Sequence, residues 1–300
     1  TADSIVDELD TLPKEKASLV WRKITERNRQ KKPNGEPNTI ACVTTPDQGF
    51  AGFIYQKWYK QKQDGYEVIK APTYSNPYLP NGYIEQIRAN YDPLLADMYI
   101  EGEIVNLSDK KVYHFFNRVK HHSDREIKPN DILHISIDFN VGGCCSNVFV
   151  LDGNTPIAVD EFVSHDTYDF VNNLNKYKSH KIIVYPDASG KANKTNATAT
   201  DIDIIKRGSF IVDAPESNPF VRDRINCVNA KLSHESFLVN TLKCPELTTA
   251  LEHQGYTDKG EPEKFNDHPA IDDWVDAMGY FIHRKFPINI QVAAPRMRRG

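Results

Sequence analysis

The chain contains 300 residues, of which 39% are hydrophobic and 26% are charged, and its formal net charge is -4. This length suggests about two domains, and the composition excludes a wholly disordered, collagen-like or coiled-coil protein. No run of apolar residues comes close to the roughly 18 that a membrane-spanning helix needs, so no membrane is expected among the partners. The near-balanced charge argues against a protein that coats DNA by bulk positive charge, although it leaves room for a local basic groove.

The five cysteines are odd in number and include no C-x-x-C pair. Such a set indicates reduced thiols in a cytosol rather than a disulfide framework or a zinc site. The neighbouring Cys144 and Cys145 are interpreted as small packing residues, because no histidine is spaced to complete a zinc site with them.

The first part of the chain is typical of an α/β protein with parallel strands, since apolar strands, polar turns and helical patterns follow one another. We expect strands at residues 4–6, 39–43 and 68–69, and helices over 14–29, around 53–58, over 83–90 and over 94–99. The polar stretch from Lys120 to Asp131 is the best candidate for a domain boundary, with His121 and His122 as solvated linker residues. The predicted domains are therefore 1–120 and 121–300.

The second part predicts the layout of a ribonuclease H-like fold, in which helices flank a mixed sheet. We expect an antiparallel meander over 132–139, 147–151 and 157–162, a helix over 167–177, a central strand over 182–185, and helices over 200–207, 221–232 and 270–284. The first strand alternates apolar and polar residues, so Asp138 is expected on the face that points away from the core.

Acidic residues stand at the ends of these elements. Asp138 ends the first strand, Asp187 follows the central strand, and Asp272, Asp273 and Asp276 begin the last helix. If the two strands lie side by side, their carboxylates and one from the helix form a pocket. Like charges this close are costly unless cations neutralise them, and Mg²⁺ and Mn²⁺ prefer oxygen ligands. Two such ions, about 3.5 to 4 Å apart, would activate a water and stabilise the leaving oxygen of a phosphodiester.

A plainer interpretation exists for each acidic residue taken alone. An aspartate after a strand is usually a turn or cap residue, and Asp272 and Asp273 would interact favourably with the helix dipole. The occurrence of three acidic positions on the appropriate elements of one fold favours the metal site.

Several segments resemble the large terminase subunit of tailed bacteriophages. In the first part, IVDELD is similar to the nucleotide-hydrolysis carboxylate segment of a P-loop motor, VTTP to its coupling motif, and APTYSNPYLPNGYIEQIRANYD with YIEGEIV to the connector of the terminase. In the second part, HISIDFN, VYPDASG and AIDDWVDAMGYF resemble the three acidic motifs of that family's nuclease domain.

The resemblance implies a DNA-packaging motor, which cuts double-stranded viral DNA with a nuclease domain and pumps it with an ATPase domain. In the ATPase part it implies that Asp7 orients the Mg²⁺ of ATP, that Glu8 positions the hydrolytic water, and that Thr44 and Thr45 sense the nucleotide. However, the sequence contains no G-x-x-x-x-G-K-[ST] phosphate loop. We therefore expect a truncated P-loop-type segment that hydrolyses no ATP and whose first ten residues are frayed or paired at a sheet edge.

In the nuclease part the resemblance implies that Asp138, Asp187 and Asp276 hold two Mg²⁺ or Mn²⁺ ions, with Asp273 as a fourth or auxiliary ligand. The choice among Asp272, Asp273 and Asp276 stays open. The resemblance also implies a portal protein and a small terminase subunit as partners, assembly of several copies on the portal, and action in the host cytoplasm and on the viral procapsid.

Contacts to double-stranded DNA would come from local positive charge. Lys191 and Lys194 follow Asp187 in a polar loop, and Lys259 and Lys264 flank a loop before the acidic helix. The basic tail at residues 296–299 is a further candidate for DNA or a second subunit. Two other functions stay open: another ribonuclease H-like nuclease or resolvase with an unrelated accessory domain, and a non-catalytic DNA-docking module.

Overall fold

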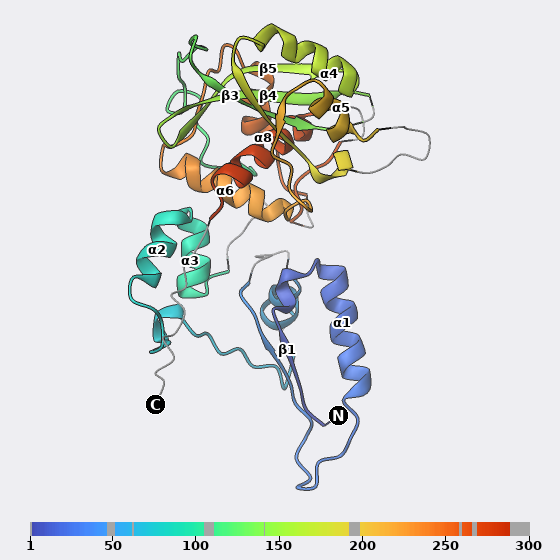
Figure 1. The fold of residues 1–300 in the computed structure, drawn as a ribbon. Helices are drawn as coiled ribbons and strands as arrows, with labels where there is room; N and C mark the ends of the chain where they lie inside the picture. The colour runs from blue at the N-terminus through green and yellow to red at the C-terminus, as the bar shows by residue number, and fades with distance from the viewer. Residues whose placement is uncertain are drawn as a thin grey trace, which may run out of the picture.

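The computed structural model describes residues 2–46, 52–61, 63–104, 111–140, 142–191, 199–257, 260–265 and 269–288. Figure 1 shows two lobes, one built around a six-stranded sheet and the other around a two-stranded sheet. We call them the sheet lobe and the first lobe. Within the described residues, none of the helices is long and apolar enough to cross a membrane.

The sheet lobe contains the predicted meander and central strand. Its strands lie in the order β7-β6-β3-β4-β5-β8. Their bounds are Ile132–Asp138 for β3, Cys144–Asp152 for β4, Thr155–Ser164 for β5, Lys181–Pro186 for β6, Ile211–Val212 for β7 and Leu238–Val239 for β8. Strands β3, β4 and β5 pair antiparallel, whereas β6 runs parallel to β3, β7 to β6, and β8 to β5. This mixed sheet confirms the expected ribonuclease H-like fold class.

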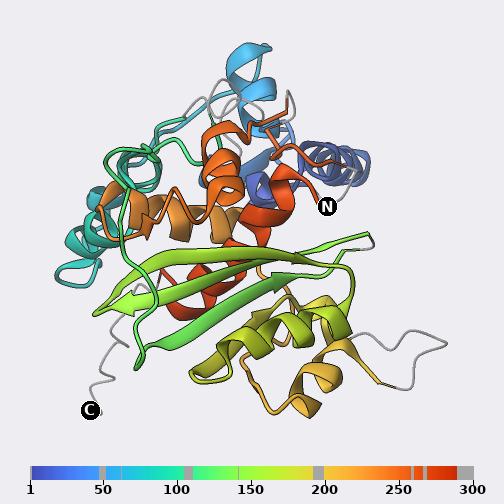
Figure 2. The ribbon, with the colours of Figure 1, turned by 90° about the horizontal axis from the view of Figure 1, so that it is seen from above.

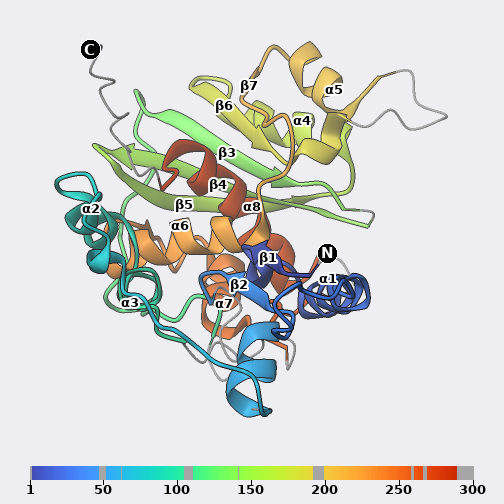
Figure 3. The same cartoon turned by 90° about the horizontal axis from the view of Figure 1, so that it is seen from below.

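Helices cover both faces of this sheet, as Figures 2 and 3 show. One face carries α4 (Thr167–Leu174) and α5 (Asp201–Arg207), and the other carries α6 (Val221–Ser233), α7 (Pro245–His253) and α8 (Ile271–Lys285). The apolar side chains of β3 enter the core on the α4 and α5 side, and its polar side chains are buried on the face that α8 covers, so Asp138 is buried rather than directed away from the core as expected. Cys144 and Cys145 lie in opposite cores as packing residues, which confirms that interpretation.

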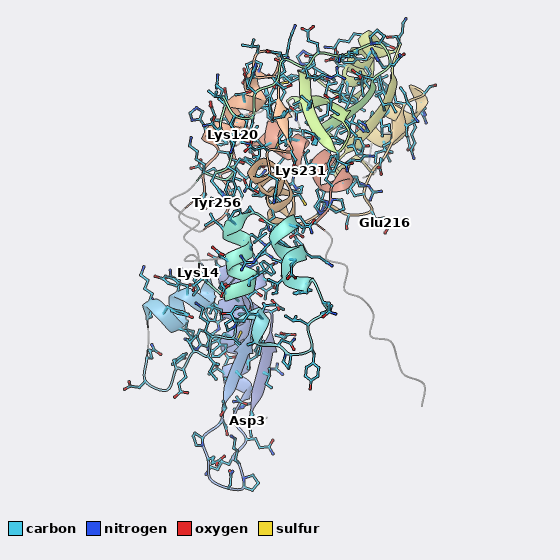
Figure 4. All side chains as sticks on the ribbon, turned by 90° about the vertical axis from the view of Figure 1, so that its left-hand side faces the viewer. Asp3, Lys14, Lys120, Glu216, Lys231 and Tyr256 are labelled. Atoms are coloured by element: carbon cyan, nitrogen blue, oxygen red, sulfur yellow. The ribbon has the colours of Figure 1, made fainter. Side chains whose placement is uncertain are left out.

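The first lobe is a strand-helix-strand unit. Strand β1 (Ser4–Asp7) pairs parallel with β2 (Ile40–Val43), and α1 (Lys14–Arg27) connects them. The first residues, expected to be either frayed or paired at a sheet edge, are paired at a sheet edge. Asp3, labelled at the far end of this lobe in Figure 4, accepts a hydrogen bond from the backbone N–H of Thr39 at 2.8 Å. Trp21, Phe53 and Trp58 pack edge-on or tilted against one another beneath the strands.

The expected helix around residues 53–58 is a short helical turn followed by a π-helical segment, Tyr55–Lys60. The strand expected at 68–69 does not form, because Val68 and Ile69 have no strand beside them and stay exposed. Two helices then follow, α2 (Tyr83–Asn90) and α3 (Pro93–Glu101), which pack on each other. The Asp92 side chain caps α3 by accepting hydrogen bonds from the N–H groups of Leu94 and Leu95.

The polar stretch from Lys120 to Asp131 contains a buried histidine. His121 is 1% exposed, its Nδ1 accepts a hydrogen bond from the N–H of Asn117, and its Nε2 lies 3.0 Å from the carbonyl of Leu232. His122 Nδ1 lies 2.8 Å from the hydroxyl of Thr241. His121 is therefore a buried structural residue, so the expectation of a solvated linker residue is wrong for it, whereas His122 is partly exposed.

Candidate active site

Asp138 and Asp187 are neighbours at one edge of the sheet. The last paired residues of β3 and β6 are Ile137 and Pro186, and each aspartate is the next residue along its strand. Because adjacent strands lie about 4.8 Å apart, the register places the two aspartates side by side. Both are buried.

A close backbone contact supports this edge. Gly190 lies in the 3-10 turn Ala188–Lys191 that follows Asp187, directly against the ring of Phe139. A Cβ atom at this position would lie 2.5 Å from the ring. The glycine therefore lets the turn after β6 pack beside the end of β3, where Asp138 stands.

Helix α8 brings the third set of carboxylates to this edge. The helix packs against β3, β4 and β6, and the Asn147 side chain of β4 donates a hydrogen bond to the carbonyl of Trp274 at 2.9 Å. Asp273 Oδ2 accepts a hydrogen bond from the N–H of Ala270 at 2.7 Å and so caps its own helix. The helix is thus held at both the sheet and its first turn, which fixes where its carboxylates point.

Asn140 connects the strand to the helix. Its Nδ2 donates to Asp138 Oδ2 at 2.7 Å and to Asp273 Oδ1 at 2.8 Å. A single amide thus holds two carboxylates from elements that are far apart in sequence. Sequence reasoning missed this residue, although it stands only two positions after Asp138 in the DFN segment.

Asp276 is held by two cations. Arg224 Nη1 lies 3.1 Å from Asp276 Oδ1, and the Lys264 ammonium donates to Asp276 Oδ2. Lys264 Nζ also lies 3.2 Å from Asp272 Oδ2. The buried Arg224 guanidinium stacks on the ring of Tyr280, 4.3 Å from its centroid. Sequence reasoning missed Arg224, because nothing near it in the sequence signals this partner.

The carboxylates affect one another electrostatically. Burial raises the pKa of Asp138 to about 7, and the charges of Asp276, Asp187 and Asp273 act in the same direction. Burial also raises the pKa of Asp272, against the opposing effect of Lys264. For Lys264 itself, burial lowers the pKa, but the neighbouring Asp276 and Asp272 outweigh it and raise the pKa above its ordinary value. The cluster therefore favours any added positive charge.

The donor set suits a hard divalent cation only in part. Asp187 Oδ1 and Asp272 Oδ1 are buried and have no hydrogen-bond partner, as expected of oxygens that a cation can use. Yet in the part of the chain that the structure describes, no three His, Cys, Asp or Glu side chains are arranged to hold a metal ion. Asp138 and Asp187 carry the oxygen donors that such an ion prefers, whereas both oxygens of Asp273 already accept hydrogen bonds from Asn140 and Ala270, and Asp276 is bound by Arg224 and Lys264.

The residues expected to act on ATP lie in the first lobe. Asp7 and Glu8 are exposed at the end of β1. Thr44 Oγ1 accepts a hydrogen bond from the N–H of Asp10 at 3.1 Å and donates one to the carbonyl of Thr45 at 3.0 Å. The nearby carboxylate of Asp10 is buried instead, and its Oδ1 accepts from the N–H of Ile54 at 3.2 Å. The segment VDELD thus contains a structural acid that sequence reasoning did not single out.

The lysines expected to contact DNA are described only in part. Lys191 ends the turn after β6, and Lys194, Lys259 and the tail at 296–299 lie outside the described residues. Lys264 is described, and its ammonium faces the acidic cluster. Its contact with DNA stays a prediction.

The mixed sheet, its two helical layers and the carboxylates at the aligned ends of β3 and β6 define a mixed α/β protein with a ribonuclease H-like sheet. No protein-family model and no curated protein sequence matches the chain.

Solved structures identify the particular fold. The large terminase from a thermophilic bacteriophage has 18% sequence identity and a TM-score of 0.63, over 94% of this chain and 69% of that chain. The same terminase in complex with ADP gives 17% identity and a TM-score of 0.65 over the same shares. The nuclease domain of the bacteriophage SPP1 large terminase with bound Mn gives 20% identity over 51% of this chain and 86% of that chain, with a TM-score of only 0.38. The chain therefore has the fold of a large terminase, which confirms the resemblance at the level of fold.

Proposed function

We propose that this chain is a metal-dependent endonuclease that cuts double-stranded viral DNA during genome packaging, as part of an ATP-driven packaging motor. The observation that carries the proposal is the burial of Asp138 and Asp187 side by side, with Asp273 tied to Asp138 through Asn140. The large-terminase fold supports the same function, because it is the fold in which the sequence motifs were expected.

In this proposal Asp138, Asp187 and Asp273 hold two divalent ions, Mg²⁺ or Mn²⁺. Asp276 becomes a further ligand once one of its two cationic partners, Arg224 or Lys264, has moved away from it. When bound, the ions supply an activated water and stabilise the leaving oxygen of the phosphodiester. Asn140 keeps Asp138 and Asp273 at a fixed separation, and Arg224 fixes the direction of Asp276.

The proton on Asp138 adds a pH dependence. The pKa of this carboxyl is raised to about 7, so near neutral pH part of the population carries a proton that a metal ion must displace. Metal binding should therefore strengthen as the pH rises through 7.

The wider assignment follows the large-terminase fold. It includes double-stranded DNA as substrate, a portal protein and a small terminase subunit as partners, several copies on the portal, and a place in the host cytoplasm. Lys191, Lys194, Lys259 and Lys264 are the proposed phosphate contacts. ATP belongs to the intact motor, with Asp7, Glu8, Thr44 and Thr45 as its residues. The ADP complex of the terminase from the thermophilic bacteriophage supports a nucleotide for that motor.

Plasmid cleavage tests the nuclease. Supercoiled plasmid is incubated with the chain over a Mn²⁺ titration, and nicked and linear products are measured on gels. The wild type should cleave and stop on chelation, whereas Asp138→Asn should not cleave although it folds. Asp124→Asn removes an exposed carboxylate of the same lobe and should cleave like the wild type. Equal cleavage by Asp138→Asn and the wild type would overturn the assignment.

A further inference from the structure

Lys264 places a positive charge inside the acidic cluster. Its ammonium lies 3.2 Å from Asp272 Oδ2 and donates to Asp276 Oδ2. These two aspartates are four residues apart on α8 and so share one face of the helix. The ammonium therefore binds the same pair of carboxylates that a metal ion on this side of the cluster would use.

The two cations at Asp276 differ in how firmly they are held. The Arg224 side chain is 6% exposed, stacks on Tyr280, and donates both to Asp276 Oδ1 and to the carbonyl of Asp276. The Lys264 side chain is 51% exposed, and its ammonium contacts carboxylates alone among the described groups. Arg224 is thus a fixed part of the helix packing, whereas Lys264 can turn into solvent without uncovering a buried cation.

One carboxylate on this side still has an unused oxygen. Asp272 is 2% exposed, and its Oδ1 has no hydrogen-bond partner. Arg224 and Lys264 together balance the charge of the pair, but the three donors of the ammonium leave Asp272 Oδ1 without a partner. A divalent ion carries twice the charge and accepts several oxygen ligands at once. The cluster consequently favours exchange of Lys264 for a divalent ion.

We propose that Lys264 is a tethered cation that occupies the Asp272–Asp276 side of the cluster and must leave when a divalent ion binds there. The inference rests on the proposed metal site. It makes Lys264 a residue that sets the metal concentration at which the site fills, because ion binding at Asp276 competes with an ammonium already in place. Arg224 stays on the other oxygen of Asp276 throughout and keeps that carboxylate directed at the site.

Metal binding without DNA tests this inference. Mn²⁺ binding is measured by titration calorimetry on the full chain for the wild type, for Lys264→Met and for Lys120→Met. The control removes a lysine of the same lobe, labelled in Figure 4, whose ammonium pairs with Glu235 at 2.8 Å. Lys264→Met should bind Mn²⁺ about 2- to 5-fold more tightly than the wild type, as expected when a competing exposed ion pair is removed. Lys120→Met should bind like the wild type.

Thermal melting gives a second readout. Without metal, Lys264→Met should melt below the wild type, because the buried Asp272 loses its cation and Asp276 keeps only Arg224. Saturating Mn²⁺ should raise its melting temperature by more than it raises that of the wild type. If Lys264→Met does not fold without metal, Lys264→Gln, which keeps a hydrogen-bond donor without the charge, replaces it in both measurements.

The outcomes separate this inference from the nuclease assignment. If the wild type binds Mn²⁺ and cleaves plasmid, but Lys264→Met binds with unchanged or weaker affinity, the tethered-cation role is wrong and the nuclease assignment stands. If neither the wild type nor Lys264→Met binds Mn²⁺, the metal site and the role of Lys264 fail together. Tighter binding by Lys264→Met that is lost in Lys264→Met/Asp276→Asn would support both.

Discussion

The two lobes use the same local arrangement in different surroundings. In each, an aspartate ends a strand whose inward residues are apolar: Asp138 follows Ile137 in the sheet lobe, and Asp7 follows Val6 in the first lobe. Asp138 is buried beneath a helix and beside other carboxylates, whereas Asp7 is exposed. A strand-end carboxylate therefore acquires unusual chemistry only where other elements cover it.

The two sheets also differ in how many of their faces are buried by other elements. Both faces of β3 are buried, one in a hydrophobic core and the other with polar side chains beneath α8, whereas β1 and β2 are covered on one face and leave Ile5 and Val43 mostly exposed on the other. A parallel pair of strands is normally buried on both faces. The sheet lobe thus supports a complete site, whereas the first lobe presents its candidate residues on an uncovered surface.

The largest expected effect on stability concerns Arg224 in the sheet lobe. Arg224→Met leaves Asp276 without its buried partner, so the free energy of unfolding should fall by about 3 to 5 kcal/mol. Urea unfolding followed by circular dichroism measures the change. Arg284→Met, which breaks the more exposed pair of Arg284 with Asp213, is the matched control and should cost less than about 1 kcal/mol. Equal losses in the two variants would show that burial does not distinguish these ion pairs.

The next largest expected effect is a pH dependence of the free energy of unfolding, which Asp138 causes. The unfolded chain releases the Asp138 proton near pH 3.8, whereas the folded chain keeps it up to about pH 7. The folded state therefore binds more protons between these values, and the stability that Asp138 contributes is lost as the pH rises through 7. The side chain in Asp138→Asn does not titrate. Without metal, the free energy of unfolding of this variant relative to the wild type should therefore rise between pH 4 and pH 8, by at most about 4 kcal/mol.

Urea unfolding at several pH values in the presence of a chelator checks this result. Asp124→Asn should keep the pH profile of the wild type, because that carboxylate is exposed. A constant difference between Asp138→Asn and the wild type at all pH values would mean that Asp138 is not protonated in the folded chain.

Much of the sheet lobe could be predicted, because its signals are local. Alternation and glycine-containing turns located the meander β3-β4-β5, and in the first part of the chain α2 spans the predicted residues 83–90. Strands β7 and β8 have only two residues each, too few for a periodic pattern, and α7 was also not predicted. Tertiary pairing, which no window of the sequence contains, decides whether such short segments become strands.

The candidate site likewise contains some residues that could be predicted from the sequence and others that could not. Asp138 and Asp187 could be placed together because each ends a predicted strand, and the parallel register then aligns them. The contacts of Asn140 with Asp273 and of Arg224 with Asp276 span 133 and 52 positions of the chain, so nothing local signals them. His121 shows the converse error: a polar neighbourhood suggested solvent, but its ring is buried against a carbonyl 111 positions away.

A smaller effect is expected in the first lobe. Asp10→Ala removes the buried carboxylate that accepts from the N–H of Ile54, and should lower the free energy of unfolding by about 1 to 3 kcal/mol. Asp7→Ala changes an exposed residue and should stay within about 0.5 kcal/mol of the wild type. Tryptophan fluorescence in a Trp274→Phe background reports this lobe alone, because Trp21 and Trp58 both lie in it. A larger loss for Asp7→Ala than for Asp10→Ala would contradict the burial of the two residues.

The smallest expected effect is none at all, and it concerns ATP. Asp7 and Glu8 are suited to act on a Mg²⁺ ion and a water that a bound triphosphate positions, and the triphosphate is held by the amides and lysine of a phosphate loop. This sequence contains no such loop, and two exposed carboxylates alone repel a nucleotide. Phosphate release from ATP should therefore stay at background for the wild type and for Glu8→Ala alike. Turnover by the wild type that disappears in Glu8→Ala would show that the first lobe builds a phosphate site by other means. The contrast between the covered and the uncovered strand end would then no longer hold.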